Sequence, residues 1–189
     1  MQQRQPQDYF QTLYEVVKAV NSSLDPKEVL SQVAEKTSWA MGVKACSIRL
    51  LSEDKKYLQA GATYGLSQSY LRKGRIEVAK SRIDQEVLAG ETVTICNACS
   101  DEKFQYPEAA EREGIKSVLA VPLSLRGQEI IGVLRVYSAE ERDFSSSEVD
   151  FLKTMADLCA LAIQNAKRHE SLRSDFELLT AFEYRLFED

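Results

Sequence analysis

The segment GIKSVLAVPL at residues 114–123, followed by IGVL at residues 131–134, decides how this chain folds. Both segments are largely apolar, and an intervening RGQ turn supplies a glycine between them. We therefore predict two antiparallel strands, 116–125 and 129–138, joined as a β-hairpin. Because Pro122 cannot donate a ladder hydrogen bond, it should lie at a sheet edge or at a bulge.

The residues ahead of this hairpin predict two helices, followed by strands and short helices. Apolar residues recur at helical spacing over residues 9–24, which indicates the first helix. Asp25 can cap a second helix with Pro26 in its first turn, and Gly42 suits its exit. The other predicted elements are strands at 45–51 and 57–64, a short helix at 81–90, an extended segment at 92–95 and a short helix at 107–113 that ends at Gly114.

A long helix follows the hairpin. Ser145 can cap it, and Glu148 stands at the capping-box position three residues later. No proline or glycine interrupts the chain from there to Asp189, and a helix of that length measures about 65 Å. That is longer than one domain needs. A stripe of residues at spacings near 3.5 follows this helix: Leu158, Ala162, Asn165, His169, Leu172, Phe176, Leu179 and Leu186.

Composition limits the classes of protein to which the chain can belong. With 189 residues, 44% of them hydrophobic and 28% charged, the chain is sized for one ordinary domain with terminal helices. The net charge is −5 and the basic residues are scattered, so we expect no nucleic-acid binding. The N-terminus lacks an apolar signal core and no apolar run is long enough to cross a bilayer, so we expect a cytoplasmic protein without a membrane partner.

The order of elements and the two hairpin segments together resemble the GAF domain, a ligand-binding and signalling module. The resemblance covers residues 12–166 and rests on GIKSVLAVPL, the IGVL strand and the FS pair before the last helix. It implies an α+β fold with a central antiparallel sheet. The first and last helices would cover one face, and middle helices and loops would cover a pocket on the other. Residues 1–8 would form a tail, 9–166 the domain and 167–189 a C-terminal helical extension.

The strand pattern and the resemblance indicate where a ligand would bind. Strands rarely bury arginine or tyrosine without a partner, so Arg49, Arg135 and Tyr137 are candidate contacts, and an arginine there would pair with an anionic or carbonyl group. Aromatic residues in the segments that would roof the pocket complete the predicted site: Tyr64, Tyr70, Phe104 and Tyr106. In the alternative interpretation these aromatic residues close the core and each arginine meets an edge or an acid. No pattern names the ligand or a cofactor.

The known ligand types and activities of the family find little support in these residues. The cyclic-nucleotide signature is incomplete, because Asn97 precedes an alanine instead of a lysine, and Asp101 and Glu102 precede Phe104 instead of following it. The single histidine, His169, lies on the terminal helix, far from any bilin cysteine or haem pocket. The cysteine pattern differs from that of the free methionine sulfoxide reductases. No set of residues for acid–base or nucleophilic catalysis stands out, so we expect that the chain is not an enzyme.

Two of the four cysteines, Cys96 and Cys99, form a C-x-x-C pair. Such a pair can cycle with a disulfide or supply half of a metal site. A second half-site would have to come from Cys46 and Cys159, which lie on a predicted strand and a predicted helix, where thiols pack as small hydrophobic groups. We therefore interpret the pair as loop residues and keep a thiol-based redox or metal sensor as the alternative.

The stripe beyond residue 166 has no domain left to bury it. It predicts a homodimer through the N- and C-terminal helices, in which Asn165 and His169 fix the register. Folding back of the stripe onto the first helix of the same chain is the alternative. Because no output domain follows residue 189, we expect output through a partner signalling protein, or a chain that is a piece of a longer one.

The resulting hypothesis is a GAF-like sensory or regulatory domain that binds an unidentified small molecule and signals through its terminal helices. Two alternatives are the thiol sensor at Cys96 and Cys99 and a pocketless protein-interaction or dimerisation module. A ligand sensor requires a cavity with convergent polar groups. A thiol sensor requires reactive exposed cysteines, and an interaction module requires neither.

Overall fold

The computed structural model describes residues 8–72, 75–98, 106–124 and 129–186. Its centre is a six-stranded antiparallel sheet with the strand order β3-β2-β1-β6-β5-β4. The strands are β1 (Ala45–Leu51), β2 (Tyr57–Tyr64), β3 (Ile76–Glu77), β4 (Val93–Ile95), β5 (Ser117–Leu123) and β6 (Gly132–Ser138). The predicted α+β class and antiparallel sheet are therefore confirmed.

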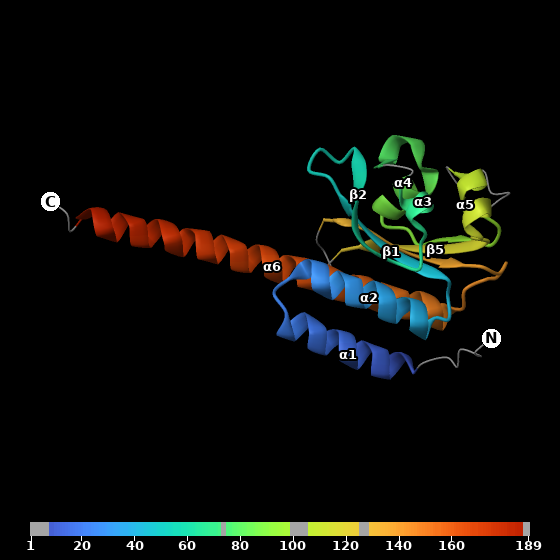
Figure 1. The fold of residues 1–189 in the computed structure, drawn as a ribbon, viewed down its shortest axis with the longest axis horizontal. Helices are drawn as coiled ribbons and strands as arrows, with labels where there is room; N and C mark the ends of the chain where they lie inside the picture. The colour runs from blue at the N-terminus through green and yellow to red at the C-terminus, as the bar shows by residue number, and fades with distance from the viewer. Residues whose placement is uncertain (1–7, 73–74, 99–105, 125–128, 187–189) are drawn as a thin grey trace.

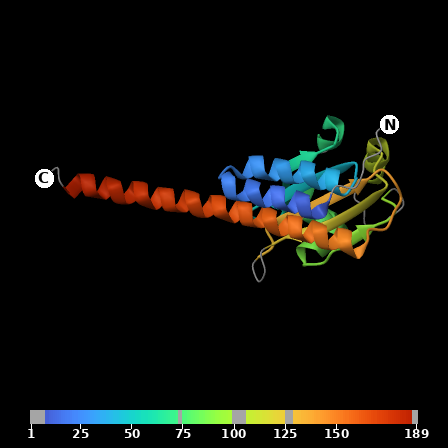
Figure 2. The same ribbon diagram turned by 90° about the horizontal axis from the view of Figure 1, so that it is seen from below.

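Three long helices lie on one side of the sheet, two of them packed on it and the third packed on those two, and we call this side of the sheet the helix face (Figures 1 and 2). They are α1 (Tyr9–Ser22), α2 (Pro26–Ala40) and α6 (Ser146–Leu186). Asp25 caps α2 as predicted, because its carboxylate accepts a hydrogen bond from the N–H of Lys27. The helix α1 begins one residue after Asp8, which caps it in the same way, and its Tyr9 ring stacks on Phe151 of α6 at 4.2 Å between centroids.

Short helices cover the opposite face, and we call them the roof and that face the roofed face (Figure 1). They are α3 (Gln68–Leu71), the 3₁₀ helix η1 (Val78–Lys80), α4 (Arg82–Leu88) and α5 (Pro107–Glu113). The helix α5 ends at Gly114, whose φ of 70° is the left-handed cap expected there. Each face has its own apolar core, so the sheet is a shared wall between two layers.

The predicted hairpin strands pair as β5 and β6, from Ser117 opposite Ser138 to Leu123 opposite Gly132. They are shorter than the predicted 116–125 and 129–138, and the RGQ turn lies outside the described residues. Strand β4 pairs with β5 only as far as Ala120, so Pro122 lies beyond its end, where β5 is locally an edge. The position predicted for Pro122 is confirmed.

The helix α6 begins with the predicted capping box. The backbone N–H of Ser145 donates to Glu148 at 2.9 Å, and the N–H of Glu148 donates to the Ser145 hydroxyl at 3.4 Å. The helix is 41 residues long, and its C-terminal part projects far beyond the domain (Figure 1). Among the described residues, no helix is both long enough and apolar enough to span a membrane.

The predicted stripe on α6 divides at the edge of the domain. Ala162 is buried against the sheet, whereas Leu172 and Phe176 are 69% and 70% exposed. The side chains of Leu179 and Leu186 lie outside the described residues. The alternative of a stripe covered by α1 is wrong, because α1 lies along the domain part of α6 and leaves Leu172 and Phe176 uncovered (Figure 2).

Gly132, in the IGVL segment, is required by the close approach of β6 to β1. A Cβ atom at this position would collide with the backbone carbonyl of Arg49 and would also touch the Leu123 side chain. The N–H of Leu51 donates to the carbonyl of Ile131 at 2.8 Å, which holds the strands together here. The glycine therefore positions the end of β1 that carries Arg49.

We predict that Gly132→Ala lowers the free energy of unfolding by about 2–3 kcal/mol, because the backbone of β1 must move. Gly42→Ala is the control, since a Cβ there meets nothing within 4 Å and only the φ of +61° opposes it. Its expected cost is about 1 kcal/mol. Urea denaturation of both variants measures the difference, and an equal or smaller loss for Gly132→Ala would refute the close-approach argument.

Candidate functional site

Polar side chains lie together on the roofed face of the sheet, within the apolar core that this face forms with the roof. The alternation of strand residues puts Ser47 and Arg49 of β1 and Arg135 and Tyr137 of β6 on this face. Ser47 lies opposite Arg135 in the ladder, and all four side chains are buried, the two arginines to 4% and 5% exposure. Buried polar groups of this density require partners.

The first partner comes from the roof. Asp84 of α4 is fully buried and forms an ion pair with Arg135. Burial by itself lowers the pKa of Arg135, but the Asp84 carboxylate outweighs burial and the pKa is raised. The pair is incompletely satisfied, because Arg135 Nε and Asp84 Oδ2 have no hydrogen-bond partner among the residues that the structure describes. The ion pair therefore holds α4 to the sheet but leaves hydrogen-bonding capacity unused.

Two tyrosines fill the space beside this pair. The Tyr137 hydroxyl lies 3.0 Å from the hydroxyl of Ser47, and the rings of Tyr137 and Tyr70 meet edge to face at 6.3 Å. Burial, followed by the proximity of Tyr137, raises the pKa of Tyr70, so its hydroxyl stays protonated at any physiological pH. These groups offer neutral hydroxyl donors and acceptors next to the two arginines.

Arg49 lies at the edge of this polar cluster and lines an open hollow. The hollow has a volume of about 460 Å³ and is walled by β2, α3 and Arg75. Arg49 Nε is buried and has no hydrogen-bond partner in the described part of the chain. The other residues that line the hollow are Leu58, Gln59, Ala60, Thr63 and Leu71. A ligand that enters from this side therefore meets a guanidinium group before it meets the core.

Of the residues predicted from the sequence, the structure brings Arg49, Tyr70, Arg135 and Tyr137 together in one cluster. Tyr106 is the residue immediately before α5, at its N-terminus. Phe104 lies outside the described residues.

The position predicted for Tyr64 is wrong. This residue packs against the core of the helix face, and its hydroxyl accepts a hydrogen bond from the indole N–H of Trp39 at 3.0 Å. The reason is an irregularity in β2, where Arg49 pairs with Ala60 but Ile48 pairs with Ala62, so that Gly61 is an extra residue. Such a bulge reverses the alternation of side chains beyond it.

The sequence interpretation missed Ser47, Thr63, Arg75 and Asp84. Thr63 depends on the same bulge, which directs it towards the roofed face opposite Ser47. Asp84 had a signal that could have been used, because it adjoins Ile83 and precedes Val87 on the apolar side of a short helix. An acid in such a position implies a buried cation, and Arg135 is that cation.

The first cysteine of the C-x-x-C pair, Cys96, directly follows β4. Cys96 is exposed, and its thiol donates a hydrogen bond to Asp143 Oδ1 at 2.7 Å. Cys99 lies outside the described residues. Burial raises the pKa of both Cys46 and Cys159 in the core of the helix face. Among the described residues, no cluster of histidine, cysteine and acidic side chains is placed to hold a metal ion.

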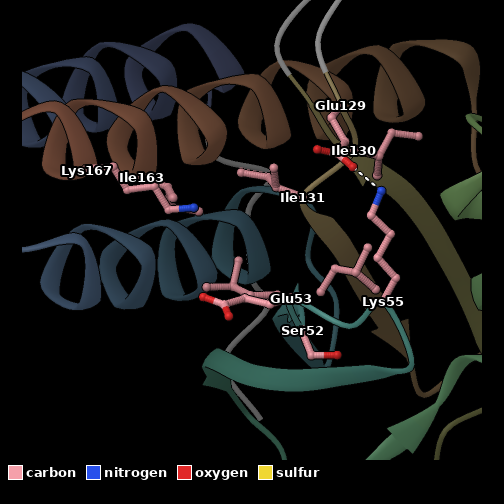
Figure 3. Close-up of a pocket in the computed structure, with 10 residues that line it drawn as sticks. Ser52, Glu53, Lys55, Glu129, Ile130, Ile131, Ile163 and Lys167 are labelled. Atoms are coloured by element: carbon pink, nitrogen blue, oxygen red, sulfur yellow. Dashed lines mark hydrogen bonds and ion pairs between the residues drawn. The ribbon is translucent and has the colours of Figure 1, made fainter.

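A second hollow, of about 250 Å³, lies where α6 leaves the domain (Figure 3). Lys55 of the β1–β2 turn forms an ion pair with Glu129, ahead of β6, along one side of it. Ile163 and Lys167 reach it from α6, and Ile131 reaches it from the position just before β6. This hollow is a junction between the sheet and the projecting helix.

Comparison with known proteins adds family information. The sequence model described as "GAF domain" matches residues 23–164. The methyl sulfide methyltransferase-associated sensor of Methanosarcina acetivorans is 26% identical over 132 residues, which are 68% of this chain and 13% of that protein. The formate hydrogenlyase transcriptional activator of Escherichia coli is 25% identical over 170 residues, which are 87% of this chain and 24% of that protein. The chain thus spans less than a quarter of the length of these relatives.

Solved structures agree with the family match. The GAF domain of an Acinetobacter phosphoenolpyruvate-protein phosphotransferase has a TM-score of 0.70 at 27% identity, with 84% of this chain and 94% of that chain covered. The free methionine-R-sulfoxide reductase of Neisseria meningitidis has a TM-score of 0.71 at 18% identity, with 85% and 91% covered. The likeness to the reductase concerns the fold alone.

We predict that Asp84→Ala lowers the free energy of unfolding by about 3–5 kcal/mol, because it leaves the Arg135 guanidinium buried without its counter-ion. The double variant Asp84→Leu with Arg135→Met should recover most of that loss, since no charge is then left unpaired. Chemical denaturation of the single and double variants measures both effects. A double variant no more stable than Asp84→Ala would contradict the ion-pair account.

Proposed function

Because the chain belongs to the GAF domain family, we propose that it is a sensory or regulatory domain that binds a small molecule between the roofed face and the roof. The signal then passes through the terminal helices to a partner protein. The two curated relatives that share this region are described as a sensor and a transcriptional activator, which supports a regulatory role.

The observation that carries this proposal is the set of unsatisfied buried atoms in the polar cluster. Of the four buried side-chain nitrogen and oxygen atoms without a partner among the described residues, three lie here: Arg49 Nε, Arg135 Nε and Asp84 Oδ2. Leaving such an atom unpaired costs about 1–3 kcal/mol. Their concentration under one roof is what a binding site requires when its ligand supplies the missing hydrogen bonds.

A continuous set of contacts links this cluster to α6. Arg49 lies two residues before Leu51, whose N–H donates to the carbonyl of Ile131 at 2.8 Å. Ile131 and Ile163 of α6 line the same hollow at the helix exit (Figure 3). A ligand that shifts the end of β1 therefore acts on the junction from which α6 projects.

In this proposed function the chain is a binding domain and not an enzyme. The chemistry of the cluster supports binding, because its arginines are permanent cations and the Tyr70 hydroxyl is held protonated. Neither an arginine guanidinium group nor a protonated tyrosine hydroxyl is a nucleophile or a general base at neutral pH. His169, the single histidine of the chain, is exposed on the projecting part of α6.

Two exposed apolar surfaces support a homodimer through the terminal helices. On α1, Phe10, Tyr14 and Val17 lie at helical spacing and are 76%, 54% and 40% exposed. On α6, Leu172 and Phe176 form the exposed stripe beyond the domain. A parallel pairing of two copies buries both surfaces and gives the projecting helices a coiled-coil geometry. The same surfaces would serve a pure interaction module, which is the second candidate function.

Native mass spectrometry of the purified chain tests both parts of the proposal. We expect a dimer at micromolar concentration that carries a small-molecule mass. The double variant Leu172→Glu with Phe176→Glu should weaken dimerisation by about 100-fold or more, because it places charges in an apolar seam. It should keep the bound mass, since the polar cluster lies elsewhere. Ser174→Glu, on the opposite side of α6, is the control and should remain dimeric.

Three outcomes separate the candidate functions. A dimer without bound mass, under every purification tried, favours the interaction module. A wild-type chain that stays monomeric refutes the dimer. A Ser174→Glu variant that dissociates as readily as the double variant shows that general charge repulsion, and not the stripe, governs the association.

A further inference from the structure

The hollow beside Arg49 contains a buried positive charge that requires a negatively charged partner. Both arginines of the cluster are buried, but only Arg135 has a counter-ion, in Asp84. Arg49 Nε has no hydrogen-bond partner within the described ranges 8–72, 75–98, 106–124 and 129–186, and the ion pairs formed within these ranges do not include Arg49. A buried guanidinium without a counter-ion is unfavourable, and an anion from outside the chain corrects this.

A second cation stands at the entrance. Arg75 lines the same hollow and is exposed, and its guanidinium carbon lies 5.7 Å from the centre of the Tyr57 ring. The ring face attracts this cation and favours a position at the rim. Two arginines of different burial, one in the floor and one at the rim, give the hollow a positive potential, although the chain as a whole has a net charge of −5.

The remaining lining limits the shape of a ligand. Leu58 and Leu71 supply an apolar wall, and Thr63 supplies a hydroxyl group near the floor. A carboxylate or phosphate presents two oxygens that match the Nε–H and a terminal N–H of one guanidinium. A volume of about 460 Å³ has room for such a group and a short organic body.

We propose that this hollow is an oxyanion subsite that binds the carboxylate or phosphate of a small organic acid through Arg49, with Arg75 as a second contact at the rim. The inference rests on the ligand-binding function proposed above and names the chemical class of the ligand. Arg135 is excluded as the anion contact, because Asp84 already neutralises it. The unpaired charge of Arg49 therefore lowers the stability of the ligand-free domain but allows it to bind an anion. The ion pair of Arg135 with Asp84 holds the fold together.

The two roles predict opposite results when each arginine is replaced. Without ligand, Arg49→Met should unfold at the same temperature as the wild type or about 2–4 °C higher, because the uncompensated charge is gone. A structural arginine would behave in the opposite way. Arg75→Met should leave the ligand-free midpoint unchanged, since Arg75 is exposed.

Thermal unfolding with added anions tests the subsite directly. Sodium phosphate and sodium succinate are titrated to 20 mM as probes, about 20-fold above a dissociation constant on the order of 1 mM, with sodium chloride at matched ionic strength as the reference. At least one probe should raise the midpoint of the wild type saturably, by about 3–7 °C. Arg49→Met should abolish the shift and Arg75→Met should reduce it. Arg82→Met, at an exposed arginine of α4, is the matched control and should keep it.

Each result has a defined meaning. A saturable response to succinate alone assigns a carboxylate, and a response to phosphate alone assigns a phosphate group. The inference is overturned if neither probe exceeds chloride, if Arg49→Met keeps the response, or if Arg49→Met destabilises the ligand-free protein. Native mass spectra separate this failure from that of the proposed function, because a neutral mass retained by both the wild type and Arg49→Met leaves a ligand pocket without an oxyanion subsite.

Discussion

The buried ion pair between Asp84 and Arg135 is the interaction on which the arrangement of this domain depends. It joins α4 of the roof to the central strand β6. Both side chains are buried, so water cannot replace either partner of the ion pair. The pair neutralises Arg135 but not Arg49, so one buried positive charge remains on the roofed face. Among the described residues, the cluster therefore has one arginine with a counter-ion, Arg135, and one without, Arg49.

The division of the sheet into two faces separates the proposed binding site from the long helices through which we propose that the domain signals. The helix face is filled by apolar side chains and by Cys46 and Cys159, which are inert there. The roofed face carries the polar groups under short helices, which are easier to displace than long ones. Strand β1 belongs to both layers, because it carries Arg49 on the roofed face and its last residue, Leu51, donates to Ile131 at the junction with α6.

Much of the fold could be predicted from the sequence because its signals are local. The Asp25 cap, the Gly114 terminator and the Ser145 capping box each act within a few residues, and each is present as expected. The position of Tyr64 could not be predicted in this way, since it depends on the bulge at Gly61, which exists only through pairing with β1. Asp84 was missed for a related reason, because its role needs a partner 51 residues away in the sequence.

The central claim is that an anion bound at Arg49 stabilises both α4 in the roof and the projecting helix α6. Amide hydrogen exchange, followed by mass spectrometry with 20 mM phosphate or succinate against chloride at equal ionic strength, measures this directly. Slower exchange in residues 82–88 of α4 and in residues 164–176 of α6, with the probe that stabilises the protein, is the predicted result. Protection confined to the hollow, with α6 unchanged, would show binding without transmission, and no protection in either segment would contradict the account.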